Sequence, residues 1–150
     1  MPEVRASCLV PIGPEKATAT WRDPRRWAGF VEGFQRVESQ GGQWPAEGAK
    51  LVWHSGPGGR GTVTEKVKSA RPTEFSTLVY EERLVGTQTF RAAEDGDGSR
   101  VDVTLEYQLT SQSPLKGVTD LLFIRRALRD ALGRTMRRFA VEADDEAGLR

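Results

Sequence analysis

Histidine and cysteine each occur once in the 150 residues, and this scarcity excludes sites built from clusters of those side chains. The single Cys8 rules out an intramolecular disulfide, and we expect it to be a buried and unreactive residue. His54 ends a predicted strand beside a glycine-rich turn, which favours a solvated position over a role in a catalytic triad. With no second histidine and no cysteine pair, we expect no zinc or other metal site, and no cofactor.

Long apolar runs and an excess of one charge are also missing. No stretch approaches the ~20 apolar residues of a membrane span, and the N-terminus lacks the basic and apolar segments of a signal peptide. The formal net charge of +1 gives no reason to expect a nucleic-acid partner. The content of 37% hydrophobic and 29% charged residues is typical of soluble globular proteins. We therefore expect one cytoplasmic domain over residues 1–150, of which about 144–150 form a polar tail that is frayed.

Alternating apolar and polar residues predict that most of the chain before residue 110 is β-strand. The clearest alternation is at 100–109, where Tyr107 belongs to the apolar face. Pro14 and the Asp23–Pro24 pair favour two short helices after the first strand. The predicted strands span residues 4–12, 34–39, 49–54, 62–68, 74–82, 87–93 and 100–109.

Strands joined by hairpin turns and separated from the helices indicate an α+β fold with an antiparallel sheet. We expect a curved sheet of about six or seven strands wrapped around a long C-terminal helix. A curved sheet and a straight helix do not fit flush, so side chains must fill the gap or leave a pocket.

The longest helical pattern covers residues 115–143. Its apolar residues recur at spacings of three and four and define one face, which comprises Val118, Leu121, Leu122, Leu128, Leu132, Thr135 and Phe139. Arg125 falls within this apolar stripe. In the interpretation that we favour, the aliphatic stem of the side chain packs on apolar surface and the guanidinium points toward solvent. In the other interpretation, the side chain points into a cavity and binds a ligand carboxylate or carbonyl.

Three stretches carry a resemblance to the START-like helix-grip superfamily, also called SRPBCC, and to its branch of small polyketide cyclase/dehydrase-like proteins. They are VRASCLVPIGPEK, DPRRWAGFVEGFQRVE and FIRRALRDALGRTMRRFA. The resemblance implies a helix-grip fold with a deep pocket under the long helix, used for lipids, sterols, polyketides or plant hormones. Some members are aromatase/cyclases, and others carry or sense ligands. One departure is Thr18, where many members have an aromatic in the first short helix, with Trp21 three residues later; this could enlarge the pocket or reshape its entrance.

Glu65 shares one strand face with Val63 and Val67. If that face is inward, Glu65 lies in the cavity, where it could act as an acid or base or pair with Arg125. The alternative is a solvated carboxylate at a strand end. The preceding loop GPGGRG is not followed by a G-K-[ST] motif and leads into a strand, so we interpret it as a hairpin loop and not a phosphate site.

The candidate ligand-binding residues are aromatic or apolar positions of the predicted strands and helices, joined by three polar side chains. They are Trp27, Phe30, Trp53, Glu65, Val67, Tyr80, Phe90, Val103, Leu105, Tyr107, Arg125, Leu128, Leu132 and Thr135. Alternation does not decide which face of 74–82 is inward, because both faces are mixed.

Two functions fit these residues. The first is binding of a small apolar or amphipathic molecule, such as a lipid or polyketide, in a cavity between sheet and helix. The second is a cyclase, aromatase or dehydratase, which requires Arg125, Glu65 and Tyr107 to converge. We expect a small-molecule partner and a monomer or homodimer.

Overall fold

The computed structural model describes residues 2–56, 59–110 and 117–148, and in the last range the side chains from Leu122 onward. The first strand is followed by the helix α1 (Pro14–Trp21), the 3₁₀ turn η1 (Pro24–Arg26) and the one-turn helix α2 (Trp27–Phe30). The long helix α3 (Gly117–Gly148) ends the chain. The strands are β1 (Glu3–Val10), β2 (Phe34–Gly41), β3 (Lys50–Ser55), β4 (Thr62–Arg71), β5 (Glu74–Tyr80), β6 (Leu84–Asp95) and β7 (Gly98–Leu109).

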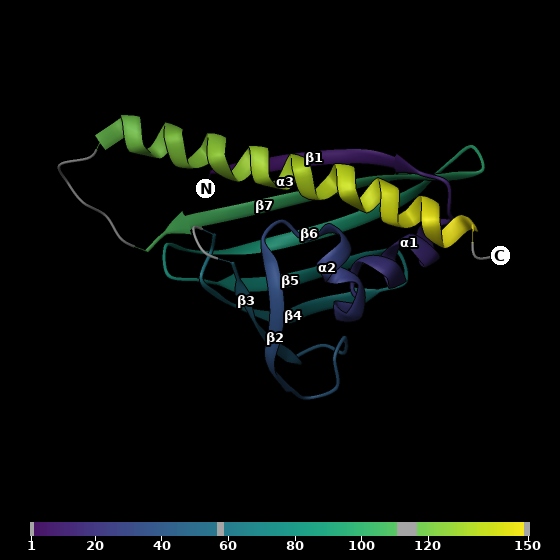
Figure 1. Ribbon diagram of the computed structural model, residues 1–150, viewed down its shortest axis with the longest axis horizontal. Coiled ribbons are helices and arrows are strands. Elements are labelled where there is room, and N and C mark those ends of the chain that lie inside the picture. The colour runs from purple at the N-terminus through teal and green to yellow at the C-terminus, as the bar shows by residue number, and fades with distance from the viewer. Residues whose placement is uncertain (1, 57–58, 111–116, 149–150) are drawn as a thin grey trace.

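All these strands form one antiparallel sheet in the order β1-β7-β6-β5-β4-β3-β2. The sheet is curved, and α3 crosses its concave side next to β1, while α1 and α2 lie under the C-terminal half of α3 (Figure 1). The predicted α+β class, strand content and order of elements are therefore confirmed.

The start of each short helix follows from local sequence. Pro14 occupies the first turn of α1, where its missing N–H is not needed. The Asp23 carboxylate accepts a hydrogen bond from the backbone N–H of Arg25 at 3.1 Å and so caps η1, the turn that leads into α2.

The core is densest under the C-terminal half of α3. Phe139 is fully buried and packs edge-on against Trp21, Phe30 and Phe90, with ring centroids 5.1–5.8 Å apart. Trp21 also stacks on Phe90 at 5.0 Å. This aromatic cluster fills the space between sheet and helix under the C-terminal half of α3, and the site described below lies closer to the N-terminal end of the helix.

Helix α3 departs from the expected pattern at both ends. Residues 144–148, expected as a frayed polar tail, continue the helix because Glu146 forms ion pairs with Arg26 and Lys16. Leu122, expected on the inner face, is 62% exposed, since it lies about 120° around the helix from Leu128. The expected inward positions of Val118 and Leu121 lie outside the described side chains. No helix in the described part of the chain combines the length and hydrophobicity that crossing a membrane requires.

Candidate ligand-binding site

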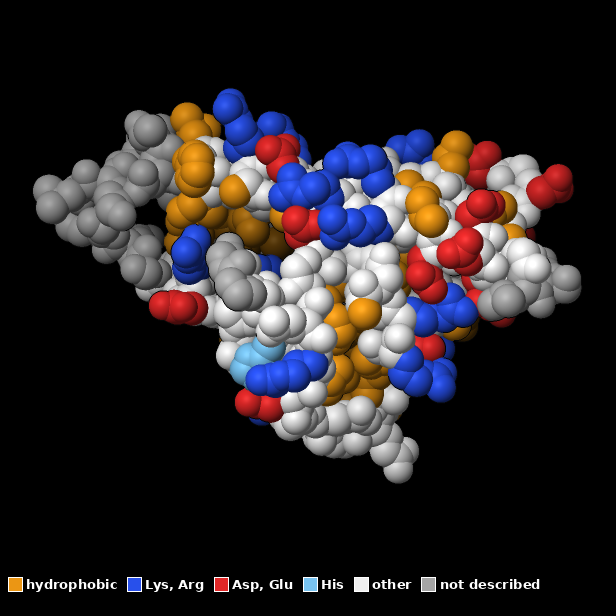
Figure 2. All heavy atoms as spheres, in the orientation of Figure 1, with side chains coloured by type: hydrophobic (Ala, Val, Ile, Leu, Met, Phe, Trp, Pro, Cys, Tyr) orange, Lys and Arg blue, Asp and Glu red, His pale blue; other side chains and the backbone are white. Residues whose placement is uncertain are grey.

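A cavity of about 430 Å³ lies between the sheet and the N-terminal half of α3. This volume is within the range of about 300–1,000 Å³ that small-molecule sites occupy. Figure 2 shows its mouth as a hollow lined by hydrophobic side chains beneath α3. Aromatic and aliphatic side chains from both layers form most of its wall, namely Trp21, Trp27, Val31, Trp53, Phe75, Leu84, Leu105, Phe123, Ile124, Ala127, Leu128, Ala131 and Leu132.

Glu65 is a buried carboxylate in this mainly apolar wall, only 7% exposed. Its Oε2 accepts a hydrogen bond from the Trp53 indole N–H at 2.8 Å, and its Oε1 accepts one from the Thr77 hydroxyl at 2.9 Å. The neighbouring inward residues of β4, Val63 and Val67, are buried as well. The inward alternative for Glu65 is therefore correct, and its partners come from the adjacent strands β3 and β5.

Arg60 enters the cavity wall from the loop between β3 and β4. Its Nε donates to Oε2 of Glu81 at 2.5 Å, and its guanidinium carbon lies 5.6 Å from the centre of the Trp53 ring. The Glu81 side chain is only 5% exposed. Within the described residues, the buried Nη2 of Arg60 has no hydrogen-bond partner. A charged donor of this kind is costly to leave unsatisfied.

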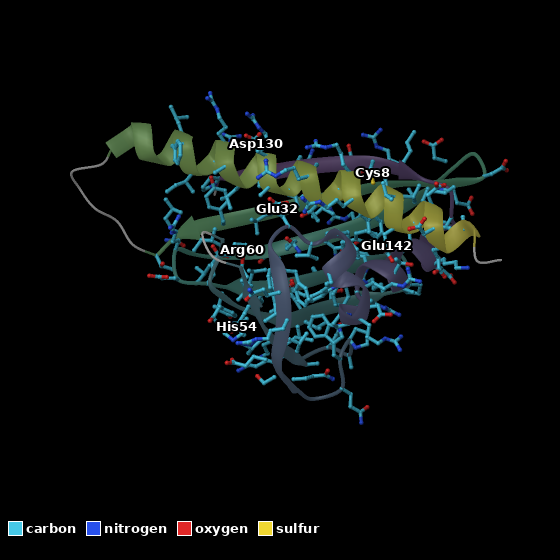
Figure 3. The ribbon with its side chains drawn as sticks, viewed as in Figure 1. Cys8, Glu32, His54, Arg60, Asp130 and Glu142 are labelled. Atoms are coloured by element: carbon cyan, nitrogen blue, oxygen red, sulfur yellow. The ribbon has the colours of Figure 1, made fainter. Side chains whose placement is uncertain are left out.

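A second group of polar contacts joins the residue Glu32, which follows α2, to α3 at the edge of the cavity. The Glu32 carboxylate accepts hydrogen bonds from Arg134 at 3.0 Å and from Arg138 at 2.6 Å. The backbone N–H of Glu32 donates to the Thr135 hydroxyl at 3.0 Å. Figure 3 shows Glu32 and Arg60 beneath α3, on the side of the strands. These contacts hold the segment after α2 against the helix at the edge of the cavity.

The structure brings half of the predicted candidates into the cavity wall. They come from α2, from the sheet and from α3, and comprise Trp27, Trp53, Glu65, Leu105, Leu128, Leu132 and Thr135. Phe30, Val67, Phe90, Val103 and Tyr107 are buried but belong to the surrounding core and do not line the cavity.

Tyr80 does not lie in the cavity, because it is 45% exposed on the outer face of the sheet. Phe75, Thr77 and Val79 are the buried residues that alternate along the inner face of β5. Ser76, on the other face, is buried too, so polarity in the sequence did not reveal the direction of this strand.

Arg125 is exposed and does not line the cavity, so the interpretation that sends it inward is wrong. No residue between positions 122 and 131 of α3 is fully buried, and an arginine on this part of the helix reaches solvent easily. Arg125 stays close to Tyr107. Burial raises the pKa of the Tyr107 hydroxyl, and the positive charge of Arg125 opposes that rise.

The remaining chemistry candidates lie outside the cavity wall. His54 is partly buried, with Nε2 3.0 Å from a Glu38 oxygen and Nδ1 3.1 Å from the Thr62 hydroxyl. Thr18 is fully buried and its hydroxyl donates to the Pro14 carbonyl, so Trp21, and not Thr18, shapes this side of the cavity.

Arg60 and Glu81 are the principal site residues that sequence reasoning missed. Both occupy short connections between strands, at 56–61 and 81–83, where no periodicity shows the direction of a side chain. The one available signal was an arginine enclosed by glycines immediately before a strand.

Comparisons with known proteins agree with this geometry. The family model described as polyketide cyclase/dehydrase and lipid transport matches residues 1–144. The chain matches no curated protein significantly. Many solved structures share the fold, among them the following three. A protein from Thermus thermophilus is 16% identical, with a TM-score of 0.76 over 95% of this chain and 97% of its own. The Zhui aromatase/cyclase from a Streptomyces species is 15% identical, with a TM-score of 0.72 over 99% and 96%. A major latex-like protein from Panax ginseng is 12% identical, with a TM-score of 0.69 over 95% and 97%. The resemblance to the helix-grip superfamily is thereby confirmed. At these identities the structural likeness shows the fold alone.

Proposed function

Because the chain belongs to the polyketide cyclase/dehydrase and lipid transport family, we propose that it binds one small hydrophobic or amphipathic molecule, such as a lipid or polyketide, between the sheet and α3. The observation that carries the proposal is the cavity of about 430 Å³ with its mainly apolar wall. An apolar wall of this kind favours ligands that lose hydrocarbon surface to it on binding.

The predicted candidates in the wall are the proposed contacts. Trp27, Trp53 and Leu105 offer apolar surface from one side, and Leu128 and Leu132 offer it from α3. Glu65 has its carboxylate oxygens bonded to Trp53 and Thr77, and in this proposal it orients the Trp53 ring.

The alternative, a cyclase or dehydratase, rests on polar groups that converge on one substrate. The set required by the sequence hypothesis does not converge, because Arg125 is exposed and Tyr107 lies outside the cavity wall. The fold does not distinguish the two functions, since its neighbours include an aromatase/cyclase and a major latex-like protein. We therefore favour binding as the function.

Native mass spectrometry of the purified protein, before and after incubation with a total lipid extract, tests the proposal. We expect a one-to-one adduct of a small molecule that disappears when the same sample is denatured. The bare mass under both conditions would contradict the proposal. The mass of the adduct identifies the ligand class.

A further inference from the structure

We propose that Arg60 is the anchor for a carboxylate group on the ligand, so that the cavity selects amphipathic carboxylic acids over neutral molecules of the same shape. This inference rests on the proposed function and names its ligand class. Its starting point is that Nη2 of Arg60 is buried and has no acceptor among the described residues, although the side chain lines the cavity. A guanidinium presents paired N–H groups that match the two oxygens of a carboxylate.

The surroundings hold the Arg60 guanidinium in place. Its Nε donates to Glu81, and its face lies over the Trp53 ring, which is itself fixed by the hydrogen bond from Trp53 to Glu65. The backbone N–H of Arg60 donates to the Ser55 hydroxyl at 3.0 Å. A donor oriented in advance loses little freedom on binding, which strengthens its contact with a ligand.

The other charged groups of the wall leave this end suited to an anion. Glu32 is paired with Arg134 and Arg138 at the rim. Glu81 is engaged by Arg60, and Arg83, two residues further on, also lines the cavity. The wall therefore holds Arg83 and also Arg60, which is paired with Glu81, while both oxygens of the Glu65 carboxylate accept hydrogen bonds from Trp53 and Thr77. A ligand carboxylate there would accept a hydrogen bond from Nη2 of Arg60, which is unpartnered within the described residues, while the hydrocarbon part would lie along the wall under α3.

Displacement of the neutral dye Nile red by dodecanoic acid and by 1-dodecanol at pH 7.5 tests the anchor, because the two chains differ only in the head group. We expect the wild-type protein to bind the acid at least about tenfold more tightly, as hydrogen bonds between charged partners usually provide. Arg60→Gln is expected to lower the affinity for dodecanoic acid to that for 1-dodecanol and to leave the affinity for 1-dodecanol unchanged. The matched variant Arg125→Gln is expected to keep the preference for the acid.

Since Arg60→Gln leaves the buried Glu81 without its partner, the double variant Arg60→Gln/Glu81→Gln serves as a second test if the single variant does not fold. Equal binding of acid and alcohol by the wild-type protein would overturn the inference. So would an acid preference that survives in the Arg60 variants, or one that Arg125→Gln abolishes. If the wild-type protein binds Nile red but shows no acid preference, only the carboxylate anchor fails. If it binds neither the dye nor the acid, the proposed function fails with it.

Discussion

At the scale of single residues, Glu65 illustrates how a buried polar group is made compatible with an apolar wall. Its two oxygens satisfy the Trp53 indole N–H and the Thr77 hydroxyl, both of which are themselves buried. Each member of this group depends on the others, since a buried donor without an acceptor carries its full desolvation penalty.

Replacing Glu65 by alanine should therefore lower the free energy of unfolding by at least about 2 kcal/mol, because it leaves two buried donors without acceptors. Glu65→Gln keeps one side-chain carbonyl oxygen as an acceptor and should lower the free energy of unfolding by a smaller amount. Urea denaturation followed by circular dichroism measures both, with the exposed Glu94→Ala as the matched control. A loss for Glu65→Ala no larger than that of the control would show that the hydrogen bonds do not stabilise the fold.

Cys8 supplies a second prediction at this scale. Burial, together with the negative charge of Asp102, raises the pKa of the Cys8 thiol to about 11. At pH 8 the reactive thiolate should then be roughly a hundredfold scarcer in the folded protein than in the unfolded chain. The rate of labelling by a disulfide reagent in buffer and in guanidinium chloride checks this. Similar rates in the two solvents would contradict it.

The same shift in the pKa of Cys8 has a consequence for stability. The folded state keeps the Cys8 thiol neutral at pH values where the unfolded chain already ionises it. The contribution of the neutral thiol to the free energy of unfolding is therefore fully present below the ordinary thiol pKa of 9.0, and it is lost as the pH rises toward the folded-state pKa of about 11.

At the scale of elements, α3 has two parts with different surroundings. Its C-terminal half carries Phe139 into the aromatic cluster and forms ion pairs through Glu142 and Glu146. Its N-terminal half covers the cavity, and the residues from 122 to 131 are at most partly buried. A helix fixed tightly at one end can cover a cavity with the other without losing its place in the fold.

Truncation after Ala143 tests the anchoring of the C-terminal end. The shortened chain loses the pairs that Glu146 makes with Arg26 and Lys16, so we expect it to be less stable by about 1 kcal/mol. Glu146→Gln in the full-length chain separates the ion pairs from the length of the helix. Thermal melting of the three proteins at low and high salt provides the measurement. A truncated chain that melts like the full-length protein would instead fit a frayed tail.

At the scale of the whole molecule, the architecture could be predicted from the sequence wherever apolar and polar residues alternate regularly. The alternation around Val103 and Leu105 predicted the buried face of β7, whereas the position of Glu65 between Val63 and Val67 left an inward and a solvated direction open until the structure decided for the inward one. Turn and cap residues located the short helices for the same reason, because their backbone requirements are local.

The cavity itself was less accessible to sequence reasoning, for three physical reasons. Both faces of β5 are mixed in polarity, which hid the outward direction of Tyr80. A helical wheel treats α3 as packed along its whole length, so it could not show that Arg125 lies on a half that stands off the sheet. Arg60 lies in a loop, where direction depends on tertiary contacts with Glu81 and Trp53 and not on spacing.

The central claim, that the space between sheet and α3 binds a ligand, is tested most directly by fluorescence titration of Nile red against a variant with a filled cavity. Ala131 lines the cavity, whereas Val141 on the same helix is 63% exposed, so Ala131→Trp and Val141→Trp form a matched pair. We predict saturable binding by the wild-type protein and by Val141→Trp, and a loss of affinity of at least about tenfold in Ala131→Trp because its side chain occupies the site. Equal binding by all three proteins, or by none of them, would contradict the account.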